Sequence, residues 1–292
     1  MRVYSTSCPT YAGDPVGIAD AAGYRQDFEW KEGFRVLKSF RRKQAYFTGF
    51  SPGVLLESLR FLPIYLRDLR LYREMNPPPS LRFHLREAFP ILTDRRSGAG
   101  TAQGHYFHQD LWAARKIYQR RPTEHYDVGS RIDGFIAHLL VFMPVTVVDI
   151  RPMESEVPGL KFVQDDARDL ANIAGDSIAS LSSLHAAEHF GLGRYSDPVD
   201  PAACFQFMRT LHRVLAPGGR LYFSVPIGRE RVEFNAHRIF ALETVLRAFE
   251  GLHLLSFCFV GDDGRLHEDV DPKGFPTSEM ACGLFEFTKT AA

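Results

Sequence analysis

The chain has 292 residues, of which 45% are hydrophobic and 24% are charged, a composition typical of globular proteins and unlike disordered or fibrous ones. Its 35 Lys and Arg balance 35 Asp and Glu. The basic residues are not interleaved with aromatic residues in the pattern typical of a nucleic-acid-binding groove, so we expect no nucleic acid partner. No apolar run of about 18 residues occurs, so no membrane-spanning helix is expected.

The four cysteines form no CxxC pair, so neither a zinc ribbon nor a disulfide scaffold is expected. Cys204, Cys258 and Cys282 lie among apolar neighbours, which is typical of buried thiols in a reducing cytoplasm. Residues 1–11 lack the basic and then apolar order of a secretory signal. The sequence therefore favours a cytoplasmic protein, and it leaves the oligomeric state open.

Charge is distributed unevenly along the chain. Residues 1–121 contain 20 of the 35 Lys and Arg but only 11 of the 35 Asp and Glu, which leaves 15 and 24 for the remainder. The basic first part either attracts the acidic second part within one molecule or contacts an anionic partner, such as a membrane surface or a phosphorylated substrate.

Residues 1–24 are predicted to be irregular, and one helix is expected within residues 27–47. Ser51 and Pro52 are typical of a helix start, and helical composition continues to Met75, with Pro63 expected to kink or split it. This segment is basic and amphipathic. It either packs its apolar stripe on its own domain or lies on an anionic membrane, which would be a peripheral contact with the inner membrane.

A break at residues 95–100 separates a partly helical, basic extension over 1–100 from a domain over 101–292. Within that domain, predicted strands alternate with helices, which indicates a mostly parallel, seven-stranded sheet with helices on both faces. Strands are predicted over 125–128, 145–149, 160–163, 178–184, 220–225, 252–260 and 283–288, and helices over 105–121, 134–141, 201–215 and 241–249, with a helix or turn over 167–173.

Acidic residues follow three successive strands, at the sheet edge where such folds bind ligands. The first strand leads into residues 127–130, where Gly129 permits close backbone approach and the next helix offers free N–H groups. The second strand ends at Asp149, placed to accept hydrogen bonds from two ribose hydroxyls. The third ends at residues 165–167, where a carboxylate can accept the amino group of an adenine.

On these residues the sequence resembles the class I S-adenosylmethionine-dependent methyltransferases over residues 106–289. More narrowly it is similar to a subgroup known as domain of unknown function 268. The resemblance implies a Rossmann-like methyltransferase fold that binds S-adenosylmethionine. The motifs that carry it are YDVGS (126–130), VVDIRP (147–152), VQDDARDL (163–170), DSIASLSSLHAAEHF (176–190) and LHRVLAPGGRLYFSVP (211–226).

The resemblance implies a cofactor site in which Gly129 lies under the methionine part, Asp149 holds the ribose, and Asp166 with Ala167 holds the adenine. The other residues assigned to this site are Asp127, Ser130, Arg131, Ile150, Asp165 and Leu184. The loop departs from the family pattern of three glycines, because Arg131 and Asp133 follow Gly129. Arg131 either pairs with the cofactor carboxylate or points to solvent.

A hydroxyl acceptor needs a general base, and histidine titrates near neutral pH. His185, His189 and His237 are the candidates, with Glu188 shaping the site. An acceptor pocket is expected around His105, His108, Arg194, Tyr195 and Asp197. Because the subgroup occurs with bacterial surface-polysaccharide enzymes, the resemblance implies O-methylation of a carbohydrate or lipid-linked glycan.

Two other functions stay open. The substituted loop is compatible with a non-catalytic binding or scaffold protein that keeps the Rossmann shell. Residues 185–189 also match the H-x-x-E-H pattern of inverzincin metalloproteases, which favours a metal-dependent enzyme using His185, Glu188 and His189 if they lie on a helix. Otherwise no metal ligand set is predicted, apart from a Mg²⁺ requirement that the sequence leaves open.

Overall fold

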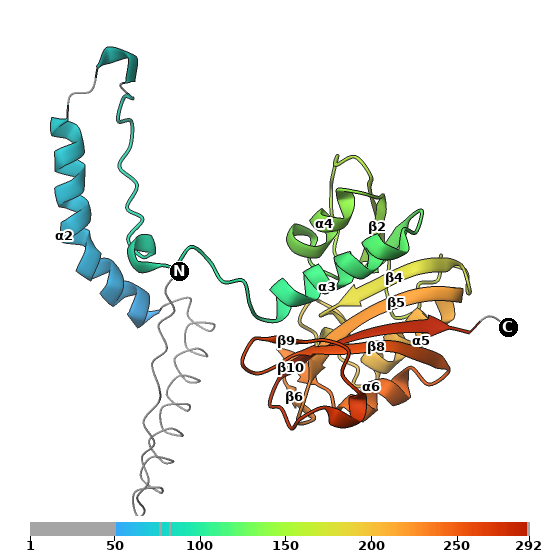
Figure 1. Ribbon diagram of the computed structural model, residues 1–292. Helices are drawn as coiled ribbons and strands as arrows, with labels where there is room; N and C mark the ends of the chain where they lie inside the picture. The colour runs from blue at the N-terminus through green and yellow to red at the C-terminus, as the bar shows by residue number, and fades with distance from the viewer. Residues whose placement is uncertain (1–50, 76–77, 82, 291–292) are drawn as a thin grey trace, which may run out of the picture. The chain divides into compact units, whose positions relative to one another are not determined.

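A computed structural model describes residues 51–75, 78–81 and 83–290 (Figure 1). The irregular segment predicted over 1–24 and the helix predicted within 27–47 lie outside the described residues. The chain divides into two compact units, Met1–Ala99 and Gly100–Ala292.

In the described part of the first unit the one long helix is α2 (Pro52–Glu74), which begins with a proline in its first turn as predicted. The helix runs through Pro63 without a break, so of the two predicted effects of this proline, a kink or a split, the split is wrong. Pro63 lies on an exposed stretch, where water can reach the carbonyl that loses its partner. Phe61 is buried, and the guanidinium groups of Arg60 and Arg96 lie 5.8 and 5.4 Å from its ring centroid.

Many apolar side chains of α2 are exposed, among them Val54, Leu56 and Leu59. Its contact with an anionic membrane stays a prediction. No described helix has the length and apolar character to cross a bilayer.

The second unit is built on one eight-stranded sheet in the order β3-β2-β1-β4-β5-β10-β8-β9. The five strands from β3 to β5 are parallel, and β10 is antiparallel to both β5 and β8. All seven predicted strands are present, which confirms the Rossmann-like fold class. The strands are β1 (His125–Val128), β2 (Val145–Asp149), β3 (Leu160–Gln164), β4 (Ile178–Leu184), β5 (Leu215–Ile227), β8 (Leu252–Val260), β9 (Leu266–His267) and β10 (Ala281–Lys289).

Three short strands were not predicted: β9 and the hairpin β6 (Arg231–Glu233) with β7 (His237–Ile239). Runs of two or three residues are too short to show an alternating pattern. The segment over 167–173, left open as a helix or turn, forms turns. The helix predicted over 134–141 begins as a π-helical turn (Ile132–Ile136) and continues as α4 (Ala137–Leu140).

Helices cover both faces of the sheet because neighbouring residues of a strand point to opposite sides. On β5, Phe223 packs into a core with α5 (Ala203–Val214) and α6 (Leu242–Ala248). The adjacent Tyr222 packs into a second core with α3 (His105–Arg120) and α4. Figure 1 shows α3 and α4 on one side of the sheet and α5 and α6 on the other.

The strand order reverses between β1 and β4, since the chain proceeds from β1 to β2 and β3 on one side and to β4 and β5 on the other. Loops that leave the carboxyl ends of β1 and β4 diverge at this point and leave a crevice. The fold therefore places any ligand site at the ends of β1, β2, β3 and β4.

Candidate functional site

A cavity of 590 Å³ lies at this switch point, a volume within the range of small-molecule sites. The sequence missed several of its lining residues, including Tyr106, Arg151, Met153, Phe162 and Arg168. The predicted site residues that line it are Gly129, Ser130, Arg131, Asp149, Ile150, Asp166, Ala167, His185, His189, Tyr195 and Asp197.

Gly129 forms the turn after β1, and its φ of 75° is a left-handed conformation that favours glycine. Its N–H donates to the carbonyl of Val148 at 3.1 Å. A Cβ at this position would lie 3.1 Å from the Cβ of Ala186, so the space beside the turn is already filled. The glycine thus brings the β1 turn, the end of β2 and the loop after β4 together.

Asp127 is fully buried below this turn and does not line the cavity. Its carboxylate accepts hydrogen bonds from the backbone and hydroxyl of Ser130, at 3.0 and 2.6 Å, and from the hydroxyl of Ser182 at 2.5 Å. The Ser130 hydroxyl also accepts from the backbone N–H of Leu184 at 2.9 Å. Asp127 therefore shapes the loop from beneath.

The buried network continues to His125, whose ring nitrogens contact Ser180 and Ser182, each at 2.8 Å. Because the Ser182 hydroxyl donates to Asp127, it accepts from His125 Nε2, which fixes the tautomer. Burial lowers the pKa of His125 to about 3, so the ring stays neutral. Burial also raises the pKa of Asp127 to about 6, against the hydrogen bonds from Ser130 and Ser182.

Asp127→Asn is expected to change how stability depends on pH. The Asp127 carboxyl binds its proton more tightly in the folded state than in the unfolded state. The stability gained from this proton is therefore complete below the ordinary pKa of 3.8 and is lost as the pH rises through the folded-state pKa of about 6. Between pH 5 and pH 7 the free energy of unfolding of the wild type should fall by on the order of 1 kcal/mol relative to that of the variant. Urea denaturation across this range measures the difference. Asp263→Asn, at an exposed aspartate, is the matched control; a flat difference curve for Asp127→Asn would contradict the assignment.

The two acids at the ends of β2 and β3 are each held by an arginine two residues later. Arg151 donates to both oxygens of Asp149, with Nε to Oδ1 at 2.9 Å and Nη2 to Oδ2 at 2.6 Å. Arg168 contacts Asp166 in the same way, at distances from 2.6 to 3.1 Å. The hydrogen bonds from Arg168 lower the pKa of Asp166 below its ordinary value, against its partial burial. The Asp149 carboxyl group is ion-paired at the cavity wall.

Arg131 is paired with Asp133 at 2.9 Å, and its guanidinium lies 5.0 Å from the ring centroid of Tyr106. All three residues line the cavity. The substituted loop therefore presents an Arg131–Asp133 ion pair to the cavity, beside the aromatic ring of Tyr106.

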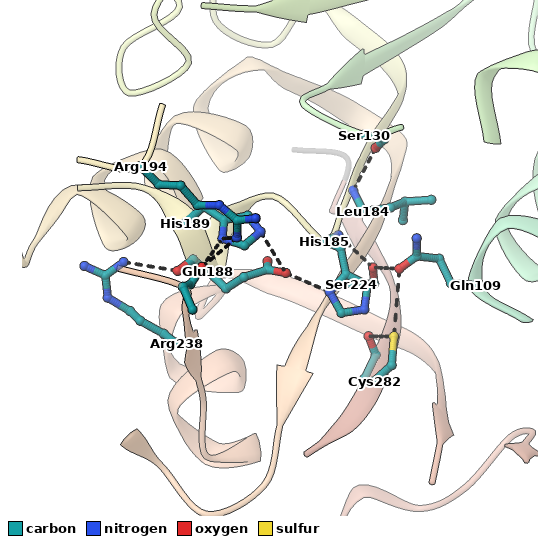
Figure 2. Close-up of polar contacts among 12 residues, drawn as sticks. Gln109, Ser130, Leu184, His185, Glu188, His189, Arg194, Ser224, Arg238 and Cys282 are labelled. Atoms are coloured by element: carbon teal, nitrogen blue, oxygen red, sulfur yellow. Dashed lines mark hydrogen bonds and ion pairs between the residues drawn. The ribbon is translucent and has the colours of Figure 1, made fainter. Parts of the chain in front are cut away.

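The loop after β4 holds a cluster of histidines around a buried carboxylate (Figure 2). Nδ1 of His185 lies 2.7 Å from Oε1 of Glu188, and Nε2 of His189 lies 3.8 Å from the same oxygen. Burial opposes a charge on His185, but the neighbouring Cys282 sulfur and the Glu188 carboxylate hold its pKa well above the ordinary value. Burial lowers the pKa of His189, whose Nδ1 contacts the carbonyl of Ala236 at 2.8 Å.

Residues 187–189 form a single 3-10 turn instead of an α-helix. His185 and His189 therefore do not share a helix face, which the protease pattern requires, and both contact Glu188 directly. Among the described residues, the group spaced to hold a metal is instead His105, His185 and Cys282.

The remaining predicted site residues do not line the cavity: Asp127, Asp165, Leu184, Glu188, His105, His108, Arg194 and His237. His105 stacks on the ring of His185, with centroids 5.5 Å apart. His237 lies 3.6 Å from Glu233 in the β6–β7 hairpin. Arg194 donates to the carbonyl of Ala236 at 2.9 Å and lies over the ring of Tyr195. Asp197 accepts from the N–H groups of Gly191 and Tyr195, so it also shapes its own loop.

A family described as a Caenorhabditis protein of unknown function, DUF268, matches residues 159–266. The chain resembles this family. The match confirms the predicted resemblance over that span, and its description names no activity. No curated protein matches the chain.

Several solved structures are similar to the chain. The N-methyltransferase NodS from Bradyrhizobium japonicum, in complex with S-adenosylhomocysteine, has 12% identity and a TM-score of 0.46, covering 64% of this chain and 89% of that one. The 1,6-didemethyltoxoflavin-N1-methyltransferase of Burkholderia thailandensis has 18% identity and a TM-score of 0.43, covering 63% and 79%. The YcgJ protein from Bacillus subtilis has 15% identity and a TM-score of 0.45, covering 63% and 99%.

Proposed function

We propose that the domain over residues 100–292 binds S-adenosylmethionine in the cavity and transfers its methyl group to an acceptor. The observation that carries the proposal is that Gly129, Asp149 and Asp166 line one cavity at the switch point of the sheet. Open α/β sheets bind their ligands at this place.

The groups around the cavity fit the parts of an adenosine. A carboxylate at the end of β2, here Asp149, accepts hydrogen bonds from ribose hydroxyls. Asp166 at the end of β3 offers an acceptor for the adenine amino group. Ile150, Met153 and Phe162 provide the apolar surface that an aromatic base requires.

Both carboxylates already accept hydrogen bonds from arginines, so adenosine has to displace part of these contacts. The Arg151 side chain is 54% exposed and that of Arg168 is 28% exposed. Exposed ion pairs contribute about 0–1 kcal/mol, so releasing Arg151 costs little compared with binding a ribose. Until then the arginines hold the carboxylates at the cavity wall.

S-Adenosylmethionine, when bound, supplies a methyl group on a positively charged sulfur. The chain has to hold an acceptor in line and, for a hydroxyl, accept its proton. His189 fits this task, because it lines the cavity and its Nδ1 donates to the carbonyl of Ala236. That hydrogen bond leaves Nε2 unprotonated.

The proposed acceptor is a hydroxylated molecule, with a carbohydrate or lipid-linked glycan as the class to test first. Next to His189 the cavity carries the ring of Tyr195, 5.7 Å from the histidine ring, and the carboxylate of Asp197. An aromatic face and a carboxylate together suit a polyhydroxylated ring.

Calorimetry with S-adenosylmethionine and S-adenosylhomocysteine tests the cofactor half of the proposal. We expect saturable binding with a stoichiometry of one. The absence of heat with both compounds would overturn the cofactor assignment. Transfer of a labelled methyl group to sugar and glycolipid acceptors tests the second half. Binding without transfer to any acceptor would favour the non-catalytic binding protein that the loop substitutions also allow.

A further inference from the structure

Three side chains from distant parts of the sequence share one space beside the cavity. One ligand atom from each of His105, His185 and Cys282 lies within 4.8 Å of the others. His105 begins α3, His185 follows β4, and Cys282 is the second residue of β10. The proposed transfer of a methyl group uses none of these three groups.

His185 is oriented by the carboxylate of Glu188. The 2.7 Å contact with Glu188 engages Nδ1, and Nε2 is buried without a hydrogen-bond partner. Only 6% of the His185 side chain is exposed, and 2% of that of Glu188. A carboxylate on Nδ1 orients the ring, and Nε2 can then bind a cation once it has given up its proton, which is the arrangement usual around metal-bound histidines.

The other two side chains are also held in place. The start of α3 is fixed by the N–H of Gly104, which donates to the carbonyl of Gly264 at 3.0 Å, and the ring of His105 stacks on that of His185. Cys282 is fully buried in β10, and its thiol makes two long contacts, of 3.8 Å with Gln109 Oε1 and of 3.9 Å with the carbonyl of Gly283 (Figure 2). Neither the thiol nor His185 Nε2 has a strong partner.

We infer that His105, His185 and Cys282 bind a zinc-type divalent cation, with Glu188 as the outer carboxylate that orients His185. Thiolate sulfur and imidazole nitrogen are the ligands that Zn²⁺ prefers. Binding needs a thiolate and a neutral imidazole, so the thiol proton of Cys282 and the Nε2 proton of His185 are both released when the metal enters. The cation's two charges are then balanced by the thiolate and by the carboxylate of Glu188.

To accept the ion, the ligand atoms have to move closer together, and the His105 ring, which is parallel to that of His185, has to turn so that both point at the metal. Zinc bonds of about 2.0 to 2.3 Å in a tetrahedron place ligand atoms about 3.3 to 3.8 Å apart, compared with the limit of 4.8 Å observed here. Within the described part of the chain, no fourth His, Cys, Asp or Glu joins the group. Three protein ligands and an open position are typical of catalytic zinc sites. Because His185 also lines the cavity, the ion would lie at its edge.

The test is metal binding by the full-length, untagged protein. We expect elemental analysis to find up to one equivalent of zinc. After removal of metal with a chelator, titration with Co²⁺ should produce a thiolate-to-cobalt charge-transfer band, which reports a sulfur ligand directly. These readouts are independent of S-adenosylmethionine, so failure of the metal site and failure of the methyltransferase proposal are separate results.

Cys282→Ser changes one atom and should abolish the charge-transfer band. Cys258→Ser is the matched control, because Cys258 is a free, buried cysteine on the neighbouring strand β8 and does not belong to the group. His105→Gln should weaken Co²⁺ binding strongly, and Glu188→Gln should weaken it about 10- to 100-fold, the usual effect of removing an outer carboxylate.

Wild-type protein with reduced thiols that binds neither Zn²⁺ nor Co²⁺ would overturn the inference, and His185 with Glu188 would then be a buried ion pair. An unchanged charge-transfer band in Cys282→Ser would overturn it as well. If Cys282→Ser fails to fold, the wild-type titration and His105→Gln decide the question.

Discussion

Asp149→Ala should weaken the binding of S-adenosylmethionine by about 10- to 100-fold. Hydrogen bonds to a charged group contribute about 1.5 to 3 kcal/mol, and 1.4 kcal/mol corresponds to a factor of ten in affinity. The substitution removes the only carboxylate at the end of β2 that lines the cavity. Because the Arg151 side chain, the ion-pair partner left behind, is 54% exposed and can be hydrated, we expect little loss of stability. Calorimetry measures the affinity, and thermal unfolding verifies the fold.

Arg151→Ala is the matched control, because it removes the other half of the same ion pair. If Arg151 competes with the ribose for Asp149, this variant should bind the cofactor as well as the wild type or up to about fivefold more tightly, given the small contribution of an exposed pair. A strong loss of affinity in both variants would mean that the pair acts as a structural unit. Equal binding by Asp149→Ala and the wild type would remove Asp149 from the site.

Asp127 and Asp149 show how far the sequence identifies a site. Both are acids at the ends of predicted strands, and both were assigned to the cofactor. In the structure Asp149 lines the cavity, whereas Asp127 is buried beneath the loop and bonded by two serines. Position along a strand is a local property that periodicity reveals. The burial of Asp127, in contrast, depends on contacts such as that with Ser182 of β4, which lies 55 residues further along the chain.

The missed arginines carry a signal that was available in the sequence. Arg151 follows Asp149 by two residues, and Arg168 follows Asp166 by the same spacing. A repeated D-x-R at two strand ends predicts two self-paired carboxylates, because a side chain two residues further on returns to the same edge. By contrast, the approach of His105 and Cys282 to His185 has no such signal, since it depends on how α3 and β10 pack on the sheet.

The loop that closes the cavity after β4 depends on Gly191. Its φ is 73°, its N–H donates to Asp197 Oδ2 at 2.7 Å, and its carbonyl accepts from the N–H of Asp200 at 3.0 Å. A Cβ at this position would overlap the carbonyl group of Asp200 and would lie 2.9 Å from the Cβ of Ala203. Backbone atoms of Asp200 cannot rotate away as a flexible side chain can.

Gly191→Ala should therefore destabilise the domain by about 2 to 5 kcal/mol, with roughly 1 to 2 from the left-handed backbone and roughly 1 to 3 from the overlap. For a domain of this size the melting temperature should fall by about 5 to 15 °C. Gly218→Ala is the matched control, because Gly218 also has a φ of 73° but has no atom within 4 Å of the added Cβ. Its loss of stability measures the backbone contribution alone. Equal losses in the two variants would show that the loop moves away from the added methyl group, and that Gly191 does not fix the wall of the cavity.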